Sequence, residues 1–502
     1  MQASPFDMRS VPAQRLLLGA IVLGFVLLQL FKLSYRWVDD ESWYLMPLPS
    51  IHAGSGFNIP SVPGDDVFWP QPPILTYLEA GLDRIAPLSA ASARVIPLLA
   101  GVLTILAGFL FGRALFTPAA GLWTALFIAT DNLVFLASRI VRPEILVTMF
   151  LAFGLFFGVK AMRADRRANL YACVAGLMAA GGVGSHPNGL LVPASIGVFW
   201  LLCCRFDKEL FARIGCFAVV FVLATLPFVL WVVANDGDNH YASFSSHWLD
   251  RYGRNAAAAQ SGFARMLTLV SSEWQGRYAD FAQYPYRVHI ALLSVALVVL
   301  SLFSRTRPIR ACAVLVLMQL LFFIFVNNSN ATVRYMTTVV PLVALLAAYW
   351  LLQAWRGYVE RKDLVRGGCA AFIVAALALS ELAGNLIYLR KIRDADYNAV
   401  VAEVSRLIPA DSVIYGGMFW WIGLREHYTV VPYMRMPWPR AVQDWHPTFV
   451  IMDDWVMTGN RVDDNWKPLR QELNEYLAAH GKMVGTVDGG FYGQLKIWSL
   501  AP

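Results

Sequence analysis

The chain is dominated by apolar segments that are long enough to cross a lipid bilayer. Mainly hydrophobic runs recur at 16–34, 94–112, 119–137, 144–160, 169–184, 189–204, 214–234, 287–304, 311–327, 335–354 and 367–388. A bilayer-spanning helix needs about 20 such residues. These segments predict a polytopic α-helical membrane protein with about eleven spans.

The composition agrees with a membrane protein and argues against nucleic acid as a partner. Hydrophobic residues make up 57% of the chain and charged residues 15%, whereas soluble domains carry about 25% charged residues. The net charge is +7, but the basic residues lie in short clusters between apolar segments. The six cysteines lie within or beside apolar runs and form no CxxC pair. They are typical of small core residues rather than of disulfides or a metal site.

The basic clusters also predict the orientation of the chain. With the N-terminus inside, all of them fall in inner connections, as the positive-inside rule requires: Arg113, 160–167, 205–213, 305–310 and 356–366. The opposite, outer side then holds a first long loop at about 35–93 and a second at about 235–286. Arg9 and Arg15 precede the first span without a small-residue cleavage site, so we expect that span to remain uncleaved.

The composition changes near residue 389 to that of a soluble module. Helical apolar spacing at 397–407 and 466–480 accompanies strand-like runs at 412–415, 448–452, 483–487 and 495–498. The sequence therefore predicts two parts: a transmembrane module at 1–388 and a small α/β domain at 389–502. An odd number of spans places the second part on the outer side.

An acidic motif follows the first apolar run directly. Asp39, Asp40 and Glu41 lie between Trp37 and the pair Trp43-Tyr44. Carboxylates near a bilayer are costly and need a functional or structural reason, although acids and aromatic residues also occur at ordinary membrane interfaces. Further along the same loop, the segment 74–85 has apolar positions on one face and predicts an amphipathic helix on the membrane surface.

More polar motifs lie in the other outer connections. Ser138-Arg139 is followed by Arg142 and Glu144, His186 lies in a short loop, and Arg334-Tyr335 precedes a late span. The second long loop mixes basic and aromatic residues, among them Trp248 and Arg251. Such a mixture suits lipid head groups and phosphates, and it equally suits interfacial anchoring.

In this order the motifs resemble those of the GT-C glycosyltransferases, in particular the protein O-mannosyltransferases and the aminoarabinose transferase that modifies lipid A. The matching segments cover about 390 residues and are Asp40-Glu41-Ser42-Trp43-Tyr44, Gln71-Pro72-Pro73-Ile74, Ala91-Ser92-Ala93-Arg94, Ser138-Arg139 with Glu144, and Arg334-Tyr335 with Pro341. Two positions depart from the pattern. Gln71 replaces a common Lys or His, and 185–189 replaces a segment with a Lys, so His186, Arg139, Arg142 or Arg334 would have to compensate.

The resemblance implies transfer of a sugar from a polyprenyl-phosphate donor to a hydroxyl of an envelope glycolipid, polysaccharide or protein. It implies a multi-pass protein of the bacterial inner membrane, with the active site and the C-terminal domain on the periplasmic or extracellular side. Asp40 is the expected base that accepts the hydroxyl proton. Glu41 is the second candidate, or else it pairs with Arg36 or Arg94. Glu144 orients the acceptor or binds a cation, or else it is a favourable acid in a first helical turn.

The remaining candidates are assigned to the donor and to the cavity. The residues expected to bind the donor phosphate or its lipid are Arg139, Arg142, His186, Arg334 and Tyr335. Arg139 and Arg142 have the alternative of pairing with Glu144 or lipid, and His186 has that of a local hydrogen bond in its loop. Other cavity candidates are Tyr44, Gln71, Arg94, Trp248 and Arg251. The motifs establish no cofactor, although Asp39, Asp40, Glu144 and His186 could together hold a divalent cation.

Two other classes of protein compete with this interpretation. A transporter or flippase of lipid-linked sugars tends to have repeated halves and polar breaks near mid-membrane. The sequence instead gathers its polar motifs on one side, and its halves do not match. A structural subunit would leave the acidic motif dispensable.

Overall fold

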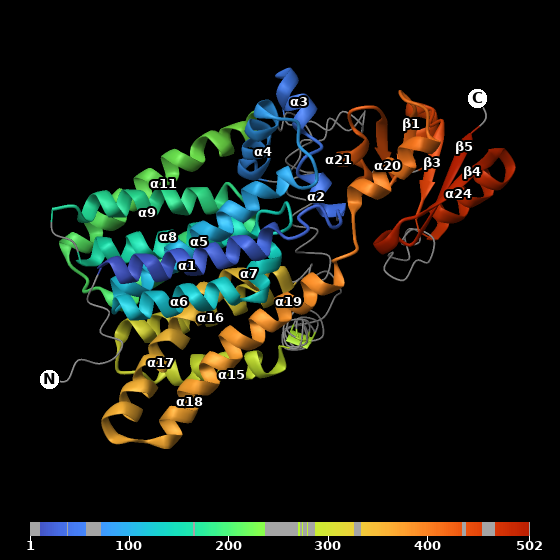
Figure 1. Cartoon of the computed structure of the whole chain (residues 1–502). Helices are drawn as coiled ribbons and strands as arrows, with labels where there is room; N and C mark the ends of the chain where they lie inside the picture. Colours follow the sequence, from blue (N-terminus) through green and yellow to red (C-terminus); the bar gives the residue numbers. More distant parts are fainter. Residues whose placement is uncertain are drawn as a thin grey trace.

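The computed structural model describes residues 11–37, 39–56, 72–163, 166–235, 270–271, 274, 279, 287–325, 333–433, 438–453 and 467–500. These residues form a bundle of long helices with a small sheet domain beyond one end (Figure 1). The short helices that follow α1 lie at that same end. We call it the motif end of the bundle.

Each apolar segment predicted from the sequence overlaps helix in the part of the chain that the structure describes. Within the described residues, seven stretches are long and apolar enough to span a membrane, and four more apolar helices are shorter. The number of spans therefore stays a prediction. All six cysteines are free. The helices of the bundle are α1 (Val11–Leu30), α5 (Val95–Leu115), α6 (Pro118–Thr130), α8 (Glu144–Arg163), α9 (Ala168–Val183), α10 (Leu191–Cys203), α11 (Lys208–Asn235), α15 (Val288–Leu302), α16 (Arg307–Phe325), α17 (Val340–Arg361), α18 (Leu364–Val374) and α19 (Glu381–Lys391).

The segment predicted as one span at 119–137 is broken into two helices. Asp131 ends α6, and its carboxylate accepts hydrogen bonds from the backbone N–H groups of Leu133 and Val134 at 2.8 and 3.1 Å. It thereby caps the short helix α7 (Asn132–Ala137). An N-cap residue has non-helical backbone angles, so a continuous helix cannot pass through Asp131.

In the described part of the first connection, at the motif end, three short helices occur: α2 (Asp39–Trp43), α3 (Leu48–Ala53) and α4 (Ile74–Ile85). The last of these has the bounds expected for the amphipathic helix. The N–H of Ile74 donates to the carbonyl of Gly184 at 3.0 Å, which ties α4 to the loop before the 3₁₀ helix η2 (Pro187–Leu190). Tyr77 and Leu78 are exposed, whereas Leu75 and Glu79 are buried.

The C-terminal domain is built on a five-stranded sheet with strand order β2-β1-β3-β5-β4. The strands β1 (Val413–Gly416), β2 (Thr429–Pro432) and β3 (Phe449–Met452) are parallel, whereas β4 (Gly481–Asp488) and β5 (Gln494–Leu500) pair antiparallel. The accompanying helices are α20 (Tyr397–Leu407), α21 (Trp421–Leu424), α22 (Trp438–Trp445) and α24 (Lys467–His480). The strand β2 and the helices α21 and α22 were not predicted.

Candidate active site

Glu41 joins three segments at the motif end. Its carboxylate accepts hydrogen bonds from Nε and Nη2 of Arg94 at 2.9 and 2.7 Å and from the N–H of Val141 at 3.0 Å. Neither side chain of the ion pair is exposed. Removing one partner of such a buried pair leaves an uncompensated charge and is strongly destabilising. Glu41 therefore holds α2 against the start of α5 and against the loop before α8.

Arg94 also fixes the chain between α1 and α2. Its guanidinium donates hydrogen bonds to the carbonyls of Leu33 and Arg36, and it lies over the ring of Trp37, 5.0 Å from the centroid. Of the alternatives that the sequence left for Glu41, pairing with Arg94 is a contact that the structure contains. Because three donors engage the buried carboxylate, we interpret Glu41 as a positioning residue and not as the base.

Several predicted site residues lie beyond what the structure describes. Asp40 is part of α2 and precedes Glu41, but its side chain, like that of Asp39, is outside the described set. Gln71, Trp248 and Arg251 lie outside the described residues altogether. Their assigned roles stay predictions. Tyr44 is buried immediately after α2.

Arg139, a candidate phosphate ligand, contacts the end of α1. Its Nη1 donates to the carbonyls of Leu28 and Gln29 at 3.2 and 2.7 Å, and its Nη2 donates to those of Phe31 and Lys32 at 2.6 and 3.2 Å. The last carbonyls of a helix have no partners within the helix, and a cation there is favourable. Since Arg139 is also fully buried, these contacts favour a cap for α1 over phosphate binding.

Arg142 and Glu144 pair with each other at the start of α8. Nε and Nη2 of Arg142 lie 2.8 and 2.6 Å from Oε1 of Glu144, which is the alternative that the sequence left open for this arginine. Oε2 of Glu144 is buried and has no hydrogen bond within the described part of the chain. Glu144 is within electrostatic range of His186. Glu144 thus keeps one carboxylate oxygen with which to orient an acceptor or bind a cation.

His186 and Tyr335 bring two further motifs together. Nδ1 of His186 accepts the N–H of Asn188 at 3.1 Å at the start of η2, and its ring centroid lies 5.3 Å from that of Tyr335. Tyr335 and Arg334 belong to the 3₁₀ helix η4 (Val333–Val339). The loop of His186 packs so closely on α9 that a Cβ at Gly189 would lie 1.9 Å from the carbonyl of Gly182.

These contacts form one continuous cluster. It runs by a hydrogen bond from Glu41 in α2 to Val141 before α8, by electrostatic proximity from Glu144 to His186, and by a ring contact from His186 to Tyr335. Segments that lie far apart in the sequence, from Glu41 to Tyr335, therefore meet at the motif end. The cluster combines carboxylates, a histidine, arginines and a tyrosine, which are groups that can accept a proton and stabilise a developing phosphate charge.

Sequence reasoning missed a buried carboxylate in α4. Glu79 is fully buried, and neither of its oxygens has a hydrogen bond within the described residues. Burial raises its pKa well above the ordinary value, and the charges of Asp83 and Glu41 raise the pKa further. A signal was available, because Glu79 follows Leu75 by one helical turn and so lies on the predicted apolar face.

A second missed group is a buried ion-pair cluster beneath the site. Nη2 of Arg287 lies 2.9 Å from Oδ2 of Asp131 and 2.7 Å from Oε1 of Glu381. The N–H of Asn132 donates to the other oxygen of Glu381 at 3.1 Å. Both acids interrupt predicted apolar segments, and ionisable residues inside such segments have functional or structural roles. The cluster joins α6, α7, α15 and α19.

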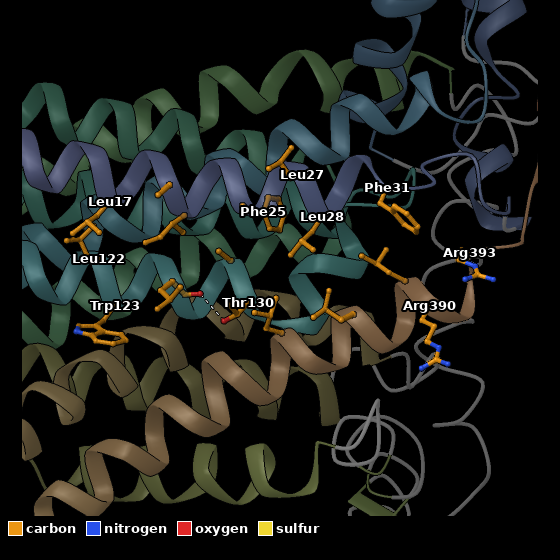
Figure 2. Close-up of a pocket in the computed structure, with 18 residues that line it drawn as sticks. Leu17, Phe25, Leu27, Leu28, Phe31, Leu122, Trp123, Thr130, Arg390 and Arg393 are labelled. Carbon is orange, nitrogen blue, oxygen red and sulfur yellow. Dashed lines mark hydrogen bonds between the residues drawn. The ribbon is translucent and has the colours of Figure 1, made fainter.

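An apolar groove of about 1070 Å³ lies between α1, α6 and α19. Figure 2 shows Leu17, Phe25 and Leu28 of α1 facing this space, with Trp123 on the α6 side. The groove follows α1 for about 20 Å, at 1.5 Å per residue. Arg390 and Arg393 line it at the motif end, near Phe31. Its shape and lining suit a long apolar chain with an anionic head.

No cluster of three or more His, Cys, Asp or Glu residues that could hold a metal ion occurs among the described residues. The predicted divalent-cation set includes Asp39 and Asp40, whose side chains lie outside that search. The cation therefore stays a prediction. Of the other members, Glu144 and His186 lie close to each other.

Comparisons with known proteins find one similar family and several similar solved structures. No curated protein sequence matches the chain, but residues 70–232 match the family described as dolichyl-phosphate-mannose-protein mannosyltransferase. The solved structure of ArnT from Cupriavidus metallidurans, bound to undecaprenyl phosphate, is similar with a TM-score of 0.64 and 15% identity over 98% of this chain and 99% of ArnT. The oligosaccharyltransferase AglB from Archaeoglobus fulgidus, in complex with an inhibitory peptide and a dolichol-phosphate, is similar with a TM-score of 0.58 and 15% identity over 95% of this chain and 74% of AglB.

The family match is confined to the first half of the chain, whereas the likeness in fold extends over nearly all of it. The match begins just before α4 and includes the loop that carries Arg139, Arg142 and Glu144. The chain therefore has the fold of ArnT and AglB, and its residues 70–232 resemble the dolichyl-phosphate-mannose-protein mannosyltransferase family.

Proposed function

We propose that this protein transfers a sugar, with inversion, from a polyprenyl-phosphate-linked donor to a hydroxyl of an envelope glycolipid, polysaccharide or protein. The observation that carries the proposal is the cluster at the motif end. There, the Glu41–Arg94 pair holds the acidic helix α2 beside Glu144, His186 and Tyr335. Titratable groups gathered in this way are typical of a catalytic site.

The chemistry needs a base and a site for the leaving phosphate. Asp40 accepts the proton of the acceptor hydroxyl as that hydroxyl attacks the anomeric carbon. The bond from this carbon to the phosphate oxygen breaks on the opposite face, and the phosphate leaves on its lipid carrier. Negative charge then develops on the phosphate oxygens, where positioned donors are most effective. His186, Tyr335, Arg334 and Arg142 are our candidates for these donors.

The groove between α1, α6 and α19 supports a lipid substrate. Its apolar walls suit a polyisoprenoid or acyl chain, and Arg390 and Arg393 suit a phosphate at the head of that chain. At the motif end of the bundle, the groove lies close to the segment that connects α1 to α2. We place the protein in the bacterial inner membrane, with the motif end and the C-terminal domain on the periplasmic face. A flippase is not favoured, because the similar proteins are transferases.

The test is transfer of label from a radiolabelled polyprenyl-phosphate sugar to an extract of envelope glycans. We expect wild-type protein to transfer label and release free carrier lipid, and Asp40→Asn to abolish both while donor binding persists. Asp444→Asn, in a surface pair with Arg440 on α22, is the matched control and should transfer label normally. Equal transfer by wild type and Asp40→Asn would remove Asp40 from the mechanism.

A further inference from the structure

The C-terminal domain touches the acidic motif directly through one tyrosine. The Tyr492 hydroxyl accepts the N–H of Trp37 at 2.7 Å and donates to the carbonyl of the same residue at 2.7 Å. A single side chain thus satisfies both backbone groups of Trp37. Buried backbone groups need such partners, and this partner comes from a residue 455 positions away in the chain.

A tight turn and a set of rings fix Tyr492. Gly490 and Gly493, on either side of it, have φ angles of 56° and 72°, a region that favours glycine. The Tyr492 ring stacks on Phe419 at 4.8 Å and contacts Trp420 at 5.1 Å. We call Tyr397, Phe419, Trp420 and Tyr492 the aromatic socket. Trp37 enters it, with its ring 6.4 Å from that of Tyr397.

Trp37 passes this contact on to α2. Its indole N–H donates to the hydroxyl of Ser42 at 2.6 Å, and Ser42 follows Glu41 in α2. On the other side of Trp37, the carbonyl of Arg36 accepts a hydrogen bond from Arg94, the partner of Glu41. The hydroxyl of Tyr492 is therefore linked through Trp37 to Ser42 in α2. Through the neighbouring Arg36 it is also linked to Arg94, the partner of Glu41.

A second contact holds the domain to the other side of the same connection. Nη2 of Arg425, just after α21, lies 2.5 Å from Oδ1 of Asp83 in α4. His52 in α3 approaches the second oxygen of Asp83 at 3.0 Å. The N–H of Tyr397 also donates to the carbonyl of Ser34 at 3.1 Å. The domain thus grips the chain both before α2 and after it.

We propose that the C-terminal domain is a positioning part of the active site, in which Tyr492 holds the acidic helix in place through Trp37. The domain then does more than shield the site or recruit an acceptor, because the geometry of α2 depends on it. This inference rests on the proposed function only where activity is measured. The positioning itself is a property of the fold and can be tested without any substrate.

The primary experiment is hydrogen–deuterium exchange on the full-length protein in lipid nanodiscs. The N–H groups of Tyr44, Leu45 and Met46 donate to the carbonyls of Glu41 and Ser42, so their exchange reports opening of α2. We expect Tyr492→Phe to speed exchange of these amides about tenfold, which corresponds to about 1.4 kcal/mol. Ser42→Ala should have the same effect, because it cuts the link to Trp37 while leaving the socket intact.

The matched control is Tyr428→Phe. Its hydroxyl also bonds to backbone carbonyls, those of Ser405 and Ile408, but both lie within the C-terminal domain. This variant should leave exchange in α2 unchanged. The proposal is overturned if Tyr492→Phe speeds exchange only within the C-terminal domain, or if both tyrosine variants affect α2 equally.

Activity provides a second readout. Once wild-type transfer is established, Tyr492→Phe should lower kcat and leave the KM for the donor unchanged, because a displaced base weakens the reacting geometry without weakening donor binding. An unchanged kcat alongside faster exchange in α2 would refute the catalytic consequence. If the wild type transfers no label, the proposed function fails, while the exchange measurement still decides the positioning claim.

Discussion

Replacing Glu41 with Gln tests whether the buried pair with Arg94 supports the site. The substitution removes the charge that compensates Arg94, and it removes at least one of three accepted hydrogen bonds. Losing one partner of a buried pair costs about 3–5 kcal/mol. We expect a value near the lower end, because the remaining amide oxygen can still accept the N–H of Val141.

The assay unfolds the purified protein in detergent, once by heating and once by denaturant. Glu403→Gln is a suitable control, because Glu403 pairs with Arg406 on the surface of α20. An exposed pair of this kind contributes no more than about 1 kcal/mol. The double variant Glu41→Gln/Arg94→Gln should be less destabilised than the sum of its single variants, because each single variant leaves a partner without compensation.

Two results would refute this reasoning. Glu41→Gln could have the same free energy of unfolding as Glu403→Gln, which would mean that the Glu41–Arg94 pair contributes little to the fold. Alternatively, the effects of Glu41→Gln and Arg94→Gln could simply add, which would mean that the two side chains do not interact in the detergent-solubilised protein. A loss of transfer without a loss of stability would return Glu41 to the list of candidate bases.

Three further outcomes follow from the structure. Burial raises the folded-state pKa of Glu79, so the stability that this carboxyl contributes is fully present below its unfolded pKa of about 4.3 and is lost as pH rises through the folded value. Glu79→Gln should therefore unfold at a higher temperature than wild type at alkaline pH, and this gain should fade towards pH 4. A gain that does not depend on pH would contradict this. Arg139→Lys should lower the unfolding temperature while leaving the affinity for polyprenyl phosphate unchanged, since a lysine cannot serve all four carbonyls of the α1 end; weaker phosphate binding in an otherwise stable variant would restore Arg139 as a ligand. Brominated anionic lipids should quench the fluorescence of Trp123 in the groove more than brominated zwitterionic lipids do, with Trp123→Phe as the reference. The double variant Arg390→Gln/Arg393→Gln should remove that difference. Equal quenching by both lipids would indicate ordinary boundary lipid.

Much of the helical architecture could be predicted because lipid imposes a simple requirement. A spanning helix needs a long apolar run, so each run in the sequence coincides with helix in the structure. The break at Asp131 could not be located in this way, because it depends on a capping carboxylate that also contacts the distant Arg287. The short strand β2 was missed for a related reason, since its four residues owe their place to parallel pairing with β1.

The candidate site was harder to derive, because residue type does not indicate what a side chain contacts. Arg139 and Arg142 both follow the pattern of phosphate ligands, yet one contacts the end of α1 and the other contacts Glu144. Glu79 is the opposite case, because the sequence motifs did not single it out. It lies in the predicted amphipathic helix, and its burial raises its pKa well above the ordinary value.

The structure also narrows the choice among the carboxylates of the site. A general base must reach the acceptor hydroxyl with an oxygen that is not already engaged. Glu41 has three donors on its carboxylate and is fully buried, and Glu144 keeps only one oxygen beside its pair with Arg142. The fixed charge of Glu41 is well suited to hold α2, while the reacting charge is assigned to Asp40. Of these two neighbouring carboxylates, Glu41 then supports the structure and Asp40 takes part in the reaction. Asp40→Asn should therefore lose transfer while keeping an unfolding temperature close to that of the wild type, in contrast to Glu41→Gln.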